Sequence, residues 1–123
     1  MAKILITGGA GFIGSQLGYK FHNDGHEVIL LDNMSFGHEN NLVVNGKKFG
    51  TFILDDIRNK SLFEHCKEID YVFHFAGIAP LPNCQENPYK AIEVNVAGTA
   101  NVLEACRVNG VKRVIFASTS AIA

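Results

Sequence analysis

Glycines stand close together near the start of the chain, at positions 8, 9, 11 and 14, directly after the apolar run at residues 4–6. Gly9, Gly11 and Gly14 fit the spacing G-x-G-x-x-G, whereas Gly8, Gly11 and Gly14 fit G-x-x-G-x-x-G. Both spacings are typical of a strand that turns tightly into a helix and leaves backbone N–H groups to bind a phosphate.

Each glycine of this turn has a physical reason to lack a side chain. Gly8 or Gly9 permits dihedral angles that a Cβ would forbid, and Gly11 lets the main chain approach a pyrophosphate. Gly14 lets the following helix pack closely against the strand. The expected cofactor-binding residues of this turn are Gly8, Gly11, Phe12, Ile13 and Gly14.

A carboxylate ends the next apolar run, because residues 27–32 read Glu-Val-Ile-Leu-Leu-Asp. Asp32 lies about 20 residues beyond the last glycine, where a carboxylate accepts a hydrogen bond from a ribose 2′-OH. Its charge would repel a 2′-phosphate, and no arginine follows directly, so the sequence predicts NAD in preference to NADP. The alternative interpretation is a strand-end acid that only faces solvent.

Strand and helix patterns alternate along the chain and would position these residues. We expect strands near residues 4–6, 27–32, 50–54, 71–75 and 111–117, a first helix that ends before Gly25, and helices over 61–67 and 89–109. Residues 33–48 are expected to be mostly loop, with a short helix as the alternative. The helix faces predicted to pack on the sheet are Ile13, Leu17 and Phe21, and Ile92, Val96, Thr99, Leu103 and Cys106.

This alternation predicts one three-layer, Rossmann-like α/β domain over residues 1–123, with a parallel sheet of strand order 3-2-1-4-5. In such a sheet, ligands bind beyond the carboxyl ends of the strands. The glycine turn, Asp32, Asp56, Ala76 and Thr119 all follow strand ends, so we expect them to share one rim of the domain.

Composition narrows the class of protein further. The 123 residues are 47% hydrophobic and carry a formal net charge of −1, which favours a compact globule over a disordered chain. No basic block suggests a nucleic-acid partner, and no apolar run is long enough for a membrane span. Cys66, Cys84 and Cys106 are expected to be reduced thiols in a cytoplasmic protein, and the histidines lack metal-binding spacing, so no metal is expected.

Taken together, the motifs resemble the NAD-dependent epimerase/dehydratase family, a branch of the extended short-chain dehydrogenase/reductases. Residues 7–14 look like its cofactor motif, and Asp32-Asn33-Met34-Ser35 is similar to its ribose-binding turn. Asp56-Ile57-Arg58 resembles the segment that flanks adenine, with Asp56 reaching the adenine amino group. Further similar segments are His74-Phe75-Ala76-Gly77, residues 95–101 and residues 116–120.

The resemblance implies bound NAD and a nucleotide-sugar substrate. The family oxidises a sugar ring, and the keto intermediate is then epimerised, dehydrated or decarboxylated. Thr119 would be the catalytic hydroxyl that hydrogen-bonds the reacting sugar, with Ser118 as the alternative. Beyond the glycine turn, the cofactor-binding residues implied are Asp32, Asn33, Asp56, Ile57, Phe75, Ala76, Gly77 and Asn95, of which Asn95 is as readily a structural residue.

The family's general base is a tyrosine in the motif Y-x-x-x-K, which this sequence lacks. Its tyrosines, Tyr19, Tyr71 and Tyr89, are followed four residues later by Asn23, Phe75 and Glu93. Because general acid–base help is worth about 10²–10⁴-fold, we expect negligible turnover from this chain alone. It would represent the cofactor-binding part of such an enzyme, truncated after the fifth strand. The alternatives are a non-catalytic NAD-binding module and an inactive remnant.

The fifth strand carries a further expectation. Ending the sheet there would leave a hydrophobic strand at its edge, which invites pairing with another chain. We therefore expect a homo-oligomer that buries Val114 and Phe116.

Overall fold

The computed structural model describes residues 1–35, 37–77 and 87–116. The main sheet is formed by β1 (Lys3–Thr7), β2 (Glu27–Asp32), β5 (Thr51–Leu54), β6 (Tyr71–His74) and β7 (Arg113–Phe116). All of its pairings are parallel, in the order β5-β2-β1-β6-β7. This confirms the predicted order 3-2-1-4-5.

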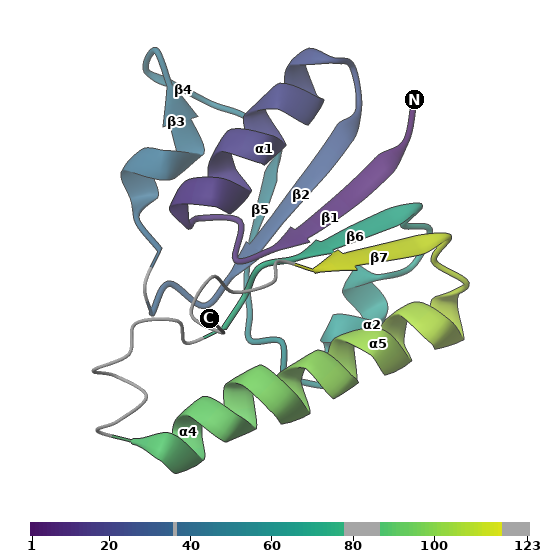
Figure 1. Ribbon diagram of the computed structural model, residues 1–123. Coiled ribbons are helices and arrows are strands. Elements are labelled where there is room, and N and C mark those ends of the chain that lie inside the picture. The colour runs from purple at the N-terminus through teal and green to yellow at the C-terminus, as the bar shows by residue number, and fades with distance from the viewer. Residues whose placement is uncertain (36, 78–86, 117–123) are drawn as a thin grey trace, which may run out of the picture.

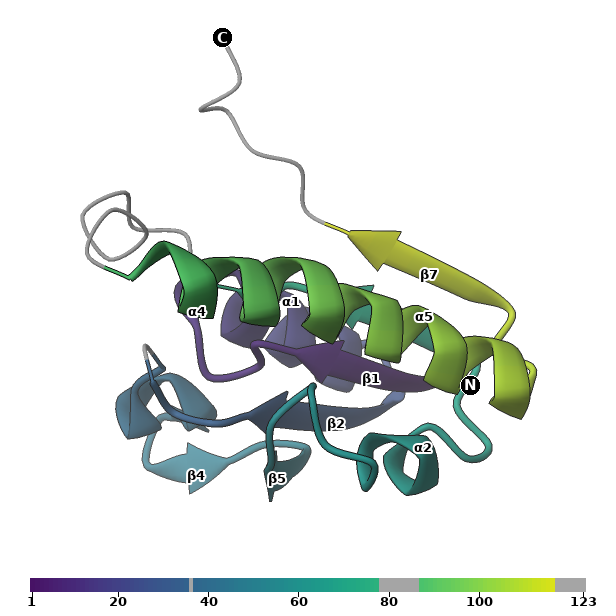
Figure 2. The same cartoon turned by 90° about the horizontal axis from the view of Figure 1, so that it is seen from below.

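Helices cover both faces of the sheet (Figures 1 and 2). Helix α1 (Phe12–Asn23) lies on one face. On the other lie α2 (Leu62–His65) and one long helix. The long helix is made of α4 (Pro88–Ile92), a π-helical stretch η2 (Glu93–Ala97) and α5 (Gly98–Asn109). The result is the three-layer arrangement expected of alternating strands and helices.

Side-chain alternation along the strands explains why the sheet needs cover on both faces. Ile4 and Ile6 of β1 belong to the core beneath α1, whereas Leu5 between them belongs to the core beneath α2 and α5. Leu30 and Leu31 of β2 divide between the two cores in the same way. All of these side chains are at most 3% exposed, so both helical layers are bound to the sheet by apolar burial.

The connection between β2 and β5 contains more structure than the predicted loop. It forms a short 3₁₀ turn, η1 (Glu39–Leu42), and a small antiparallel hairpin of β3 (Val43–Val44) and β4 (Lys47–Lys48). Leu42 and Phe49 are buried in the core beneath α1, which anchors this connection to the domain.

No helix in the described ranges is long and apolar enough to cross a bilayer.

The predicted sheet-facing side of α1 was wrong in part. Ile13 is 62% exposed, and Leu17 and Phe21 are half-buried. The residues that the helix buries are Gly14, Ser15 and Gly18. A Cβ on Gly18 would lie 2.8 Å from Leu30 Cδ2, so α1 approaches the sheet too closely for large side chains. Apolar spacing cannot reveal a face built from small residues.

The predicted face of the long helix was also wrong in part. Ile92, Val96 and Leu103 are 59%, 64% and 43% exposed, whereas Cys106 is buried and Thr99 half-buried. The covered side is formed by Ala91, Val94, Gly98, Val102, Ala105 and Cys106. Both sides of this helix are apolar, and the π-helical stretch shifts its periodicity, so spacing alone selected the wrong stripe.

Candidate functional site

Gly8 makes the sharp turn after β1, with a φ of 71° in the left-handed region. A Cβ there would lie 2.8 Å from both the backbone N of Ala76 and the carbonyl C of Phe75. Gly9 does not have a positive φ, but its Cβ would lie 2.7 Å from Leu30 Cβ. The turn therefore depends on Gly8 for its dihedral angles and on Gly9 for its close packing on β2.

Gly11 is the N-cap of α1, and no described side chain caps this helix end. Its own N–H donates to Gly8 O at 3.0 Å, and its carbonyl accepts the N–H of Ser15. The first N–H groups of a helix have no acceptor within the helix, so those of Phe12 and Ile13 stand at the positive end of the α1 dipole. The side chains of Phe12 and Ile13 are 71% and 62% exposed, so it is their backbone that could meet an anion.

Asp32 is 8% exposed and fixes this turn from the end of β2. Its Oδ2 accepts the N–H of Ala10 at 3.0 Å, and its Oδ1 accepts the N–H of Met34 at 2.8 Å. Met34 adopts a left-handed φ of 66°, which turns the chain back after the strand. Since a carboxylate has about four acceptor sites, Asp32 keeps further acceptor capacity for a ligand hydroxyl.

An open cleft lies along the carboxyl ends of the strands, as the fold predicts. Most predicted cofactor residues line it: Gly8, Gly11, Asp32, Asn33, Asp56, Ile57, Phe75, Ala76 and Gly77. Phe12, Ile13, Gly14 and Asn95 do not. Gly14 instead lies against Gly8, where its Cβ would collide with the Gly8 carbonyl.

Asn95 lies beside the cleft on η2. A Cβ on Gly77 would stand 2.8 Å from Asn95 Oδ1, so the amide is close to the chain that follows β6. Its backbone carbonyl accepts the hydroxyl of Thr99 at 2.6 Å. The predicted catalytic Thr119 and its alternative Ser118 lie outside the described residues.

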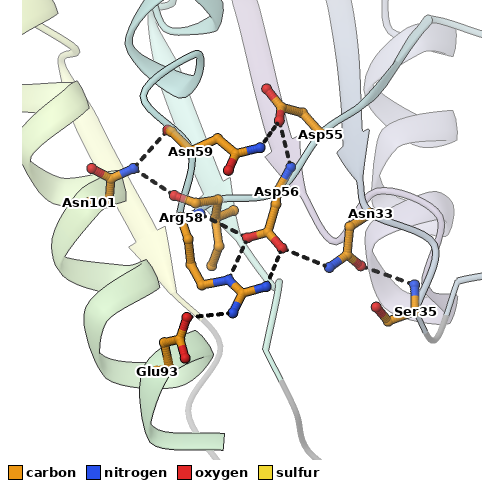
Figure 3. Close-up of polar contacts among 9 residues, drawn as sticks. Asn33, Ser35, Asp55, Asp56, Arg58, Asn59, Glu93 and Asn101 are labelled. Carbon is orange, nitrogen blue, oxygen red and sulfur yellow. Dashed lines mark hydrogen bonds and ion pairs between the residues drawn. The ribbon is translucent and has the colours of Figure 1, made fainter. Parts of the chain in front are cut away.

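Asp56 and Arg58 form a two-pronged ion pair at one end of the cleft (Figure 3). Asp56 Oδ1 accepts from the backbone N and the Nε of Arg58, each at 2.9 Å, and Oδ2 accepts from Nη2 at 2.7 Å. Arg58 Nη1 also donates to Glu93 Oε1 at 2.8 Å. The hydrogen bonds from Arg58 outweigh burial and hold the pKa of Asp56 well below its usual range. Asp56 is therefore a fixed, charged acceptor.

Asn33 joins this ion pair from the end of β2. Its Nδ2 donates to Asp56 Oδ2 at 3.2 Å, while its Oδ1 accepts the N–H of Ser35 at 3.0 Å (Figure 3). The two predicted recognition points, the turn after Asp32 and the segment beginning at Asp56, are thus linked directly.

The neighbouring Asp55 has a structural role. It accepts from Asn59 Nδ2 at 2.7 Å, from the hydroxyl of Ser61 and from His65 Nε2 at 2.9 Å, and so fastens the start of α2. Burial would raise the pKa of Asp55, but these hydrogen bonds outweigh it and leave that pKa lowered. Asn101 of α5 holds the same loop by donating to Ile57 O at 2.7 Å.

His74 is buried among hydroxyls behind the cleft. Thr7 Oγ1 accepts the N–H groups of Phe75 and Ala76, so its proton points to His74 Nδ1 at 2.6 Å. Thr99 donates its proton to a backbone carbonyl, so its oxygen accepts His74 Nε2–H at 2.9 Å. These contacts assign the neutral Nε2–H tautomer. Burial lowers the pKa of His74 to about 4, which keeps it neutral.

Sequence reasoning missed part of the cleft lining, namely Leu31, Gly37, Asp55, Lys90 and Val94, and it assigned no role to Ser35 and Arg58. Ser35 and Arg58 both belong to segments that resemble the family, but the charge of Arg58 does not by itself indicate that its guanidinium binds Asp56. Lys90 and Val94 are four residues apart on the long helix, and only tertiary packing brings them to the strand ends. No local signal in the sequence could have identified them.

The sequence pattern of the NAD dependent epimerase/dehydratase family matches residues 4–123. The chain belongs to this family. A UDP-glucose 4-epimerase of Klebsiella pneumoniae is 37% identical over 126 residues, which cover 98% of this chain and 91% of that protein. A UDP-N-acetyl-alpha-D-glucosaminuronate decarboxylase of Bacillus cytotoxicus is 40% identical over 123 residues, covering 98% of this chain and 37% of the decarboxylase.

Solved structures of family members share the fold. A UDP-glucose-4-epimerase of Stenotrophomonas maltophila, crystallised with NAD and formylated UDP-arabinopyranose, superposes with a TM-score of 0.90 at 26% identity. The match covers 99% of this chain and 38% of that epimerase. The chain thus spans little more than a third of the length of most family members it resembles.

Proposed function

We propose that this chain binds NAD in the cleft and represents the cofactor-binding part of a nucleotide-sugar epimerase, dehydratase or decarboxylase. The observation that carries the proposal is the connection between Asp32 and the glycine turn. A phosphate-binding helix start and a diol-binding acid are held together by one hydrogen bond, from Ala10 N to Asp32 Oδ2.

The residues present fit a dinucleotide. A pyrophosphate would lie over the amides of Phe12 and Ile13, where Gly11 leaves no side chain in the way. The adenosine ribose diol would reach Asp32, and adenine would lie against Asp56 and Ile57. The nicotinamide end would then extend toward Phe75–Gly77, which line the same cleft.

Two features support NAD in preference to NADP. Asp32 lines the cleft with its carboxylate, which would repel a 2′-phosphate. The nearby Arg58 has its guanidinium occupied by Asp56 and Glu93, so it is poorly placed to neutralise that phosphate. The Stenotrophomonas relative, crystallised with NAD, is consistent with this choice.

Calorimetric titration with NAD and NADP tests the proposal. Micromolar binding of NAD, with NADP at least tenfold weaker, is the expected result. Heat changes no larger than those of dilution for both dinucleotides would contradict it, and would leave an inactive remnant as the better account. Equal affinities would contradict only the assignment of Asp32 to the ribose.

For the chemistry, we propose Thr119 as the hydroxyl that contacts a nucleotide-sugar substrate, with the general base supplied from outside the printed sequence. Since this sequence carries no Y-x-x-x-K motif, the chain alone should bind NAD without reducing it in the presence of UDP-glucose. Absorbance at 340 nm measures this directly, and steady NADH formation would overturn it.

We also propose that two copies associate through β7. Among the described strands, β7 pairs only with β6, so its other edge is unpaired. Phe116 at the end of this strand is 51% exposed. Val114 of the same strand is half-buried. Light scattering should report a dimer or larger species, and a monodisperse monomer at about 100 µM would contradict the proposal.

A further inference from the structure

The carboxylate of Asp56 is fully occupied within the protein. It receives three hydrogen bonds from Arg58 and one from Asn33. A carboxylate offers about four acceptor sites. A purine amino group therefore cannot simply add to Asp56, as the proposed function requires, unless one of the present donors leaves.

The four donors are not equally replaceable. The donors of Arg58 approach Asp56 at 2.7–2.9 Å, one of them is the main chain, and the guanidinium is also held by Glu93. The contact from Asn33 is the longest, at 3.2 Å, and is exposed. This contact can break while the main chain of Asp56 and Arg58 stays in place.

Asn33 is also anchored independently of Asp56. Its Oδ1 accepts the N–H of Ser35, so the loop after β2 keeps a contact when the Nδ2 bond is lost. Figure 3 shows the contact between Asn33 and Asp56. Asn33, Ser35 and Asp56 all line the cleft, so this exchangeable contact is accessible to a ligand there.

We propose that the Asn33 amide is a placeholder on Asp56 Oδ2, which the exocyclic amino group of the cofactor's purine displaces. Arg58 is the positioning residue that keeps the carboxylate charged and aimed during the exchange. The inference rests on the proposed function and adds to it a determinant of base specificity. The base is selected because a purine without the 6-amino group gains nothing by displacing Asn33.

The test compares NAD with the analogue in which hydrogen replaces the 6-amino group of adenine. The measured quantity is the ratio of the two dissociation constants, obtained by calorimetry. Contacts of Asn33 to ribose or phosphate affect both ligands alike and cancel in this ratio. In the wild-type chain, the ratio should favour NAD by about threefold, because the hydrogen bond that the amino group gains is stronger than the long, exposed contact that Asn33 gives up.

Removal of the competing amide should increase discrimination. In Asn33→Ala the ratio should rise about threefold further, because NAD no longer has to displace a donor. Asn59→Ala is the matched control, since Asn59 also donates to an aspartate, Asp55, but does not line the cleft. It should leave the ratio at the wild-type value. Asn33→Ser serves as a second variant if Asn33→Ala does not fold.

Arg58→Lys tests the positioning role. It keeps the charge but loses the planar fork, so the ratio should fall toward one while the affinity for the analogue stays constant. Equal weakening of both ligands would indicate a structural role and contradict this part of the proposal.

These measurements distinguish failure of the Asn33 placeholder from failure of NAD binding itself. A ratio that is the same in wild type, Asn33→Ala and Asn33→Ser overturns the placeholder and leaves NAD binding intact. Failure of the wild-type chain to bind either dinucleotide overturns the proposed function and this inference together.

Discussion

The carboxylate of Asp32 accepts the backbone N–H of Ala10 at 3.0 Å, so the acid that ends β2 holds the turn that follows β1. Because its other oxygen accepts the N–H of Met34, the carboxylate also shapes the loop beyond it. One side chain thus organises two strand ends of the cleft before any ligand arrives, which lowers the entropy lost on binding.

Asp32→Asn should weaken NAD binding at least tenfold and reduce the preference over NADP. An amide N–H would face either Ala10 N–H or Met34 N–H, and the charge that repels a 2′-phosphate would be gone. Calorimetry with both dinucleotides measures the effect. Asp24→Asn, which removes an exposed carboxylate at the end of α1, is the control and should change neither affinity. An unaltered NAD preference in Asp32→Asn would count against the ribose assignment.

Alanine at two glycines of the turn should give different defects. In Gly14→Ala the new Cβ meets the carbonyl of Gly8, a backbone group that cannot move aside, so the free energy of unfolding should drop by about 2–3 kcal/mol. Gly11 has an extended ψ of 172° that alanine accepts, and its Cβ would lie 3.2 Å from Gly8 O. Gly11→Ala should therefore fold but lose NAD affinity.

Urea unfolding followed by circular dichroism, together with calorimetry on each variant, distinguishes the two effects. Equal stability losses in Gly11→Ala and Gly14→Ala would contradict the assigned division between phosphate approach and helix packing.

The stability of the fold should depend on the protonation of His74. Its pKa is about 4 when folded and ordinarily 6.5, so between these values the unfolded chain binds the extra proton. The contribution of the neutral ring is complete above pH 6.5 and is lost as the pH falls toward 4. The loss approaches ~1.4 kcal/mol per pH unit and totals about 3 kcal/mol.

His74→Gln provides the comparison, because its amide can accept from Thr7 and donate to Thr99 without titrating. The free energy of unfolding in urea should be measured between about pH 7.5 and about pH 4.5, a range that spans the transition. It should decline more steeply for wild type than for His74→Gln. Parallel declines would show that His74 is not the group responsible.

Cys66 and Cys106 should resist alkylation while the chain is folded. Both are buried, at 0% and 4% exposure. The thiol–thiol hydrogen bond with Cys106, reinforced by burial, raises the pKa of the Cys66 thiol, which suppresses its reactive thiolate. The same hydrogen bond lowers the pKa of Cys106, so Cys106 is protected by its burial alone. In a Cys84→Ser variant, Cys66 and Cys106 are the two remaining thiols. Mass spectrometry after iodoacetamide treatment should find no adduct on this variant without denaturant. Rapid native labelling would contradict the packing of α2 on α5.

The order of the sheet was predictable because its strands are short apolar runs and its turns are marked by glycine. That Gly8, Asp32 and Asp56 line one cleft was predictable because each lies at or within two residues of the carboxyl end of a strand. The buried faces of the helices were not. Gly18 is buried because α1 lies too close to the sheet for a larger side chain, and Ile92 is exposed although its spacing fits a core position.

The four hydrogen bonds that the Asp56 carboxylate accepts from Arg58 and Asn33 could not be predicted either. Only one residue, Ile57, separates Asp56 from Arg58 in the sequence, a spacing that does not imply a bidentate pair. Asn33 is 23 positions away from Asp56. The contact with Asn33 arises because β2 and β5 are neighbours in the sheet and end side by side. Side-chain networks at strand ends depend on such pairings, which local patterns do not encode.

The most direct measurement is a crystal structure of the chain grown with NAD. The crystal should show the pyrophosphate over the amides of Phe12 and Ile13, the adenosine ribose diol on Asp32, and the adenine amino group on Asp56 in place of Asn33. A dinucleotide bound elsewhere, or a glycine turn without ligand at a saturating concentration of NAD, would contradict it.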